Sequence, residues 1–494
     1  MERAGFFASS STDASYDAGP GHSGYRPGRS ATTRAALVVF VLWGATLAGE
    51  HVARLASWRL GTTVLCAGLV VWAGRHTSVL ITIAAVLGLT GGATAWHAVP
   101  VVPTVACGGM ARLVTDPEGW RGATEAVVEL NGHRLRVTAR GTAAGRLAAR
   151  VSGESVRVEG RCSPAVRRHE RVRHVTGRLE ARTVSEGFSP GSAAVRASTR
   201  VRRAVTDGVA TMDHDKRSLF TGLVIGDDRD QPADMVARFR ASGLSHLCAV
   251  SGQNVAHVLA AFSPLLRRRR PAVRLALTLG LLAWFALLTR MEPSVLRACT
   301  MAGAVALNGA WRLVANPRLI LCLSAGGLLV VDPMLAFSVG FALSVSATAG
   351  LAWLSAPIGR HLGVLTRGRV PRLREVTAAT LAAQVGTAPV LLLVFGSVPV
   401  VSLVANPLAV GVAGIVMLVG LPAALLAAVV PVLEPVVSRL LAMPVGWVDL
   451  VARVCAAVGP TGAANLWCWA GVGVVAAVAW RRTRWRNGAG ATAV

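Results

Sequence analysis

The chain has 494 residues, of which 53% are hydrophobic and only 15% are charged. Ordinary soluble domains carry about 25% charged residues, so the composition excludes a soluble enzyme, a disordered chain and a fibrous protein. The 51 basic and 25 acidic residues give a net charge of +26, and Lys216 is the only lysine. Arginine suits bidentate contact with phosphate, although cytoplasmic loops of membrane proteins are basic in any case. Part of the excess therefore indicates an anionic partner.

The first hundred residues predict a tail followed by membrane helices. Residues 1–30 are polar and contain no apolar run, which predicts a disordered cytoplasmic tail. Residues 31–99 hold apolar segments at about Ala35–Ala48, Leu60–Ala73 and Val79–Trp96. The flanking arginines favour an inside N-terminus, so three spans place the following residues outside.

Residues 100–190 form the one long polar segment. Its short alternating apolar runs, with Asn131-Gly132 between two of them, predict about five strands and a hairpin. Such a set predicts a small barrel of the OB-like type. Residues 101–200 hold 17 arginines against 9 acidic residues and few aromatics, so contact with nucleic acid would be made to backbone phosphates. Cys107 and Cys162 bracket much of the segment, and we expect them to form a disulfide if it faces an oxidising compartment.

Residues 191–217 have the spacing of an amphipathic helix. Arg196, Arg200 and Arg203 share one face, and Val205 and its apolar neighbours share the opposite one. The pattern predicts an interfacial helix against anionic lipid headgroups, with nucleic acid as the alternative ligand.

A second membrane block covers residues 218–481, and a cytoplasmic tail is expected at residues 482–494. The expected spans lie at about Leu219–Ile225, Leu244–Phe262, Val273–Leu288, Leu296–Trp311, Leu319–Val331, Leu335–Leu354, Ala378–Phe395, Val398–Val416, Met417–Val430, Val436–Val454 and Leu466–Trp480. The predicted fold class is a polytopic α-helical membrane protein of about 10–13 spans with an inserted small OB-like β-barrel outside the cytoplasm.

Polar groups at membrane depth are costly, so each one marks a candidate functional site. The densest group comprises Gly243, His246, Ser251, Gly252, Gln253 and Asn254. Glycines and amides so close together predict a broken or re-entrant helix whose freed backbone groups line a cavity. The alternative for His246 is a structural histidine satisfied by its surroundings.

Arg297 lies about one turn into another apolar segment. Its desolvation costs roughly a few kcal/mol on insertion scales, so its guanidinium should face a carboxylate, an anion or water. Glu292 is the candidate carboxylate, and a phosphate is the candidate anion. Arg290 and Glu292 themselves are expected to cap helix ends at the interface.

Two later groups interrupt the apolar spans. Gly340, Phe341 and Ser344 follow a turn and indicate close helix packing. Gln384 and Asn406, each with a nearby proline, mark two further breaks in the helices.

The sequence holds no metal or nucleotide motif. GFSPG at Gly187–Gly191 matches the hydrolase pattern GxSxG by letter, but no apolar strand leads into it, so the match is taken as chance. The acidic residues between Asp227 and Asp234 fit a solvated loop that caps the next helix better than a divalent-ion site. No HxH, HExxH or Walker loop occurs. We therefore expect no enzymatic activity, no cofactor and no bound metal.

The run Phe239–Gly252, FRASGLSHLCAVSG, resembles the signature of the ComEC competence-protein family, the membrane channels of bacterial DNA uptake. Further similarities follow in the family's order across about residues 215–410, at Gly222–Gly226, Pro293–Ala298, Asp332-Pro333, Gly340–Ser344, Gln384, Pro389, Phe395 and Asn406-Pro407. The order of N-terminal spans, OB-like domain and membrane domain is similar as well.

The resemblance implies that one DNA strand passes through the bacterial cell membrane into the cytoplasm and that the OB-like domain meets DNA first. It implies a phosphate contact for Arg297. The residues expected on the path are His246, Ser251, Gly252, Gln253, Asn254, Arg297, Gln384 and Asn406.

The sequence departs from the family in two places. Gln253-Asn254 stands where many members have Leu-His, so the role of that second histidine is lost or taken by an amide. Many members also end in a metallo-β-lactamase-like domain, whereas this sequence ends at Val494 without an HxHxDH pattern. We therefore expect a separate nuclease to degrade the other strand.

The other expected partners are single-stranded DNA, membrane lipids, a periplasmic or surface DNA receptor and a cytoplasmic ATP-driven motor; a homo-oligomer is left open. A permease for a smaller phosphate-bearing or other anionic solute is the alternative function. An enzyme acting on lipid phosphate, with His246 as acid or base, is the third and weakest hypothesis.

Overall fold

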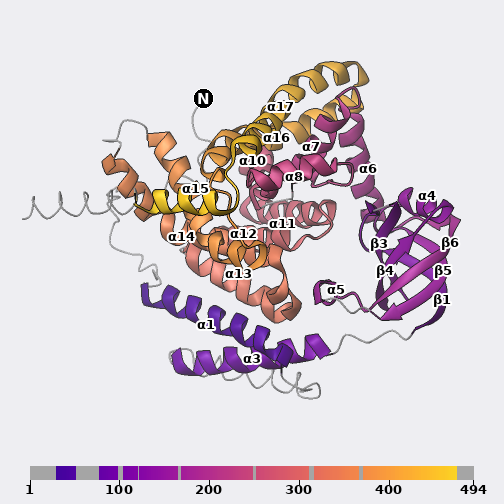
Figure 1. Cartoon of the computed structure of the whole chain (residues 1–494), viewed down its shortest axis with the longest axis horizontal. Coiled ribbons are helices and arrows are strands. Elements are labelled where there is room, and N and C mark those ends of the chain that lie inside the picture. Colours follow the sequence, from indigo (N-terminus) through magenta and orange to yellow (C-terminus); the bar gives the residue numbers. More distant parts are fainter. Residues whose placement is uncertain are drawn as a thin grey trace, which may run out of the picture.

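The computed structural model describes residues 29–51, 77–97, 104–120, 122–164, 168–248, 252–310, 316–365 and 371–474. Figure 1 shows a β-barrel at one side of a larger helical body. Helices α1 (Arg29–Ala48) and α3 (Thr77–His97) lie side by side along the helical body, and α1 contacts α13 (Pro317–Val331). The predicted span Leu60–Ala73 and the first 28 residues lie outside the described residues.

The polar segment forms the predicted barrel. Its strands are β1 (Val105–Leu113), β2 (Glu118–Trp120), β3 (Ala123–Leu130), β4 (His133–Ala139), β5 (Ser155–Pro164) and β6 (Gly177–Ser189). The sheet order is β1-β5-β6-β4-β3-β2, and an additional pairing of β1 with β3 closes five of the strands. All neighbours are antiparallel except β4 and β6, which are parallel. This five-stranded closure confirms the expected OB-like class.

Local sequence explains how the barrel closes. Asn131 and Gly132 have φ values of 51° and 79°, so both adopt the left-handed conformation that a two-residue hairpin turn between β3 and β4 requires. Helix α4 (Thr142–Ala148) then covers the barrel and inserts fully buried Leu147 among the inward-facing residues of the strands.

Cys107 of β1 and Cys162 of β5 form a disulfide, with their Cα atoms 5.8 Å apart. The two cysteines are separated by 55 residues in the sequence. By the chain-entropy model, a loop of that length stabilises the folded barrel by about 4 kcal/mol.

Replacing both cysteines by serine should therefore lower, by about 4 kcal/mol, the free energy needed to open the barrel and expose its backbone amides to exchange. Hydrogen–deuterium exchange of β5 in the reconstituted chain measures this quantity. Cys468→Ser, which removes an exposed free cysteine, is the control. Unchanged protection of β5 in the double variant would show that the disulfide does not stabilise the barrel.

The rest of the described chain is mainly helical. Helix α5 (Arg168–Val172) lies between β5 and β6. After the barrel come α6 (Ala193–Asp207), α7 (His214–Ile225), α8 (Ala233–Ala241), α9 (Ser245–Cys248), α10 (Gly252–Arg267), α11 (Pro271–Leu288), α12 (Pro293–Ala310), η3 (Pro333–Phe337), α14 (Val339–Leu365), α15 (Pro371–Phe395), α16 (Ser402–Val429), η4 (Pro431–Leu433) and α17 (Glu434–Val458). A further helix covers residues 462–474.

Seven helices within the described ranges are long and apolar enough to cross a bilayer. They lie at Ala31–His51, Val79–His97, Pro271–Leu288, Val339–Gly363, Arg374–Phe395, Ser402–Val429 and Pro431–Val458. The chain is a multi-pass cell-membrane protein.

Small residues set the closest helix contacts. A Cβ atom on Gly350 of α14 would lie 2.1 Å from the carbonyl oxygen of Ala382 in α15, and one on Gly386 would lie 2.4 Å from that of Ser346. These distances are too short for any side chain, so glycine lets the two backbones touch. This is the contact by which helices associate in lipid.

Three predicted boundaries differ from the structure. Val398–Val416 and Met417–Val430 were expected as two spans, but both belong to α16, whose internal prolines, Pro407 and Pro422, do not end it. The amphipathic segment 191–217 is divided, because α6 ends at Asp207 and α7 begins at His214. Within the expected span Leu244–Phe262 the structure describes two helices, α9 and α10, and α10 continues past Phe262 to Arg267.

Candidate functional site

Arg297 is a buried cation on the second turn of α12, with only 5% of its surface exposed. Its Nε donates to Oγ of Ser344 in α14 at 2.8 Å, and its Nη1 lies 3.0 Å from Sδ of Met301. A thioether is a weak acceptor. Among the described residues, neither Glu292 nor any other carboxylate forms an ion pair with Arg297. The charge is therefore held inside the helical body without a counter-ion.

The guanidinium of Arg297 lies at the beginning of α10. A Cβ atom on Gly252, the first residue of α10, would be 2.9 Å from Nη2 of Arg297 and 3.2 Å from Cβ of Ala298. Glycine therefore lets the guanidinium approach the end of the helix. A helix N-terminus has free N–H groups and a partial positive charge. Two sources of positive potential converge here, which is an arrangement suited to an anion.

A second polar group joins α8, α15 and α16. Nε2 of Gln384 donates to Oγ of Ser402 at 2.9 Å. Gly243 has a φ of 75°, and a Cβ atom there would lie 2.5 Å from Cβ of Ser402. Asn406, one turn after Ser402, is 8% exposed. Oδ1 of Asn406 and Oε1 of Gln384 are buried without a hydrogen-bond partner among the described residues, so both can accept from water or a ligand.

The signature residues around the break between α9 and α10 have different surroundings. Nδ2 of Asn254 donates to the carbonyl oxygen of Leu223 at 2.8 Å and ties α10 to α7. His246 of α9 and Gln253 of α10 are exposed. Ser251 lies outside the described residues. The described contacts join Gly252 and Ser344 to Arg297, and Gly243 and Gln384 to Ser402. His246 also contacts the backbone of Gly243.

The three residues that were expected to pack at the start of α14 have different surroundings. Phe341 is fully buried and packs against Trp43 of α1, with ring centroids 5.3 Å apart. Gly340 is exposed and has open space around it, rather than the close helix contact that was expected. Ser344 holds the guanidinium of Arg297, which is a more specific role than packing.

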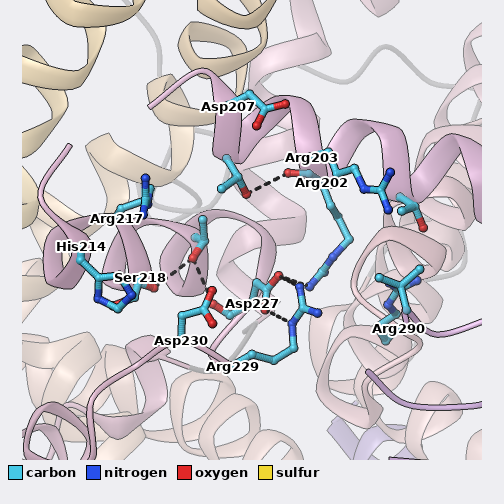
Figure 2. A pocket seen from close by; sticks show the side chains of 14 residues that line it. Arg202, Arg203, Asp207, His214, Arg217, Ser218, Asp227, Arg229, Asp230 and Arg290 are labelled. Carbon is cyan, nitrogen blue, oxygen red and sulfur yellow. Dashed lines mark hydrogen bonds and ion pairs between the residues drawn. The ribbon is translucent and has the colours of Figure 1, made fainter. Parts of the chain in front are cut away.

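A buried ionic cluster, which the sequence analysis did not find, joins the barrel to the helices. Asp116, just after β1, accepts from Nε and Nη2 of Arg290 at 3.1 and 2.9 Å. Nη2 of Arg202 lies 3.5 Å from Asp116 and 2.8 Å from Asp227. Asp227 also pairs with Arg229 at 2.7 and 2.6 Å. Figure 2 shows Arg202, Asp227 and Arg229 converging below α6.

The comparisons with known proteins agree with the sequence signature. Residues 223–486, more than half of the chain, match the family model described as Competence protein. The chain belongs to the competence protein family. It is 29% identical over 199 residues to ComE operon protein 3 of Bacillus subtilis (strain 168), a match that covers 39% of this chain and 24% of that relative. No solved structure matches the chain.

In this competence protein, Arg202 also caps two helices. Its Nη1 donates to the carbonyl oxygens of Ile225 and Leu288, the last residues of α7 and α11, at 3.3 and 3.1 Å. Cations are favourable at helix C-termini because the terminal carbonyls carry partial negative charge. The sequence held one signal for this role: Arg202 lies three residues before Val205, on the apolar face of α6.

The ionic cluster lowers the pKa values of its carboxyl groups. Burial alone would raise the pKa of Asp227, but its bonds to Arg229 and the charge of Arg202 lower it to about 2. Burial would likewise raise the pKa of Asp116, and Arg290, Arg202 and Arg229 hold it below its ordinary value. Both carboxylates are therefore ionised at neutral pH and pair with the arginines around them.

The acidic run after α7 is thus more than a solvated loop. Asp227 is committed to Arg202 and Arg229, and Arg290 binds the barrel instead of capping a helix. In the part of this competence protein that the structure describes, no group of three or more His, Cys, Asp or Glu residues could hold a metal ion.

Proposed function

We propose that the chain is an inner-membrane channel for uptake of transforming single-stranded DNA from outside into the cytoplasm. The observation that supports this most is the environment of Arg297, a cation that is 5% exposed, lies at the N-terminus of α10 and has no carboxylate partner among the described residues. A DNA phosphate would supply the missing negative charge and accept a hydrogen bond from Nη2.

The rest of the proposed path follows from the polar groups of the helical body. Gly252 and Ser344 position Arg297, and the free amide oxygens of Gln384 and Asn406 offer acceptors farther along. His246, Ser251 and Gln253 belong to the break between α9 and α10, where freed backbone groups can line a cavity. Asn254 supports this break through its bond to α7.

The OB-like barrel supports DNA rather than a small solute as cargo. OB folds bind nucleic acid strands on their surfaces, and in residues 101–200 arginines outnumber acidic residues 17 to 9. A permease for a smaller anion would use Arg297 but would not need the barrel. We further propose a surface DNA receptor, a cytoplasmic ATP-driven motor and a separate nuclease as partners.

Uptake of labelled DNA into a nuclease-protected cytoplasmic pool tests the proposed function. We expect deletion of the gene to reduce this pool to background and the wild-type chain to restore it. Uptake that is unchanged by deletion would contradict the channel. Loss of small-anion transport with unchanged DNA uptake would favour the permease.

A further inference from the structure

A polar pocket of about 240 Å³ lies between α6, α7 and the segment after α7, beside the barrel. Its lining comprises Val151, Thr199, Arg202, Arg203, Thr206, Asp207, His214, Arg217, Ser218, Thr221, Asp227, Arg229, Asp230 and Arg290. Val151, from the barrel, is the one apolar side chain among them. The path proposed above does not include this pocket.

Two of the five arginines in the lining are available to a ligand. Arg202, Arg229 and Arg290 each form an ion pair with Asp116 or Asp227. Arg203 and Arg217, by contrast, form no ion pair with any described residue. Nη1 of Arg217 donates to the carbonyl oxygen of Ala210, which leaves its other N–H groups free.

Other donors face the same space. Oγ1 of Thr199 is buried and has no hydrogen-bond partner in the described part of the chain. Helix α7 begins at His214, and the side chain of its N-cap residue, Asp213, does not cap it, so the first N–H groups of α7 have no side-chain acceptor there. Two carboxylates of the lining, Asp207 and Asp230, form no ion pair with a described residue and are exposed, where water solvates their charge. The pocket therefore offers mainly donors and positive charge.

The positions of the arginines favour an extended anion. Figure 2 shows His214 and Arg217 at one end of the pocket, Arg203 and Arg290 at the other, and Arg229 between them. Consecutive phosphates along a strand can each contact the guanidinium group at one end. A phospholipid would also require an apolar groove for its acyl chains, which this lining does not provide.

We propose that this pocket binds consecutive phosphates of the incoming DNA strand, with Arg203 and Arg217 as the contacts at its two ends. The proposal rests on the proposed function. It places a phosphate site between the barrel and Arg297. Of the lining residues, Val151 comes from the barrel, and Arg290 lies seven residues before Arg297 in the sequence, next to the start of α12. The strand would thus meet guanidinium groups before it reaches the buried cation.

The test is binding of a fluorescent single-stranded oligonucleotide to the full chain in nanodiscs of neutral lipid, at several salt concentrations. Each phosphate contact on a single strand contributes about 0.7 to the slope of log affinity against log salt. Arg203→Ala with Arg217→Ala should therefore reduce that slope by about 1.4 and weaken binding about tenfold at 0.1 M salt. Arg196→Ala with Arg200→Ala is the control, since it removes equal charge from α6 outside the pocket.

Each result decides the proposal. A reduced slope in the Arg203/Arg217 variant, with a smaller change in the control, supports the pocket. Equal loss in both variants, or an unchanged slope in the first, overturns it and leaves the channel function standing. A variant that differs from wild type only in nanodiscs containing phosphatidylglycerol identifies a lipid site instead. A wild-type chain that binds no strand overturns both proposals.

Discussion

Replacing Arg297 by alanine is expected to reduce DNA uptake about 100-fold at equal membrane abundance. As a free energy, this loss lies within the range of about 2–5 kcal/mol that removal of one partner of a buried charged contact costs. The guanidinium of Arg297 lies at the N-terminus of α10 and has no counter-ion among the described contacts, and the substitution removes this charge. The measurement is the nuclease-protected pool of labelled DNA in a deletion strain carrying each variant.

Two further variants separate the charge from the shape of the side chain. Arg297→Lys keeps the charge but loses the planar fork that binds phosphate, so it should retain part of the uptake. Ser344→Ala removes the hydroxyl that orients Nε and should have a smaller effect than Arg297→Ala. Wild-type uptake by a stable Arg297→Ala chain would remove Arg297 from the path.

Replacing Arg202 by methionine is expected to destabilise the junction between the barrel and the helices by about 3–5 kcal/mol, because it leaves buried carboxylates without their partner. Arg202 is 6% exposed, pairs with Asp116 and Asp227, and caps α7 and α11. Methionine fills a similar volume but satisfies none of these groups.

Hydrogen–deuterium exchange at the C-terminal amides of α7 in the reconstituted chain measures this loss. Arg203→Met is the matched control, because the neighbouring side chain is exposed and unpaired among the described residues; its effect should be within about 0.5 kcal/mol. If the two variants exchange alike, Arg202 does not hold the junction.

The sequence by itself determined the class of the protein. Apolar segments of the length of a bilayer gave most of the membrane helices, since a lipid-facing helix must be apolar along its whole length. Alternation with period two and the Asn131-Gly132 turn gave the barrel, because these signals are local. The family signature at residues 239–252 was equally local, and the family match includes it.

Sequence patterns were less informative where a helix could continue past a proline or end at an unremarkable residue. Pro407 and Pro422 lie within α16, because neighbouring helices in a membrane protein can satisfy the backbone groups that proline leaves free. The helix predicted across residues 191–217 ends at Asp207. Its C-cap, Gly208, lies against the backbone of α16, where a Cβ atom would be 1.9 Å from the carbonyl oxygen of Ala424.

Only the tertiary structure decided which charges are neutralised. Arg290 and Arg297 look alike in sequence, seven residues apart, yet Arg290 binds Asp116 of the barrel and Arg297 has no carboxylate partner among the described residues. The partner of Arg290 is 174 residues away in the chain, and no periodicity records such a separation. Burial and distance to an opposite charge determine what a charged group can bind, and both are properties of the folded chain.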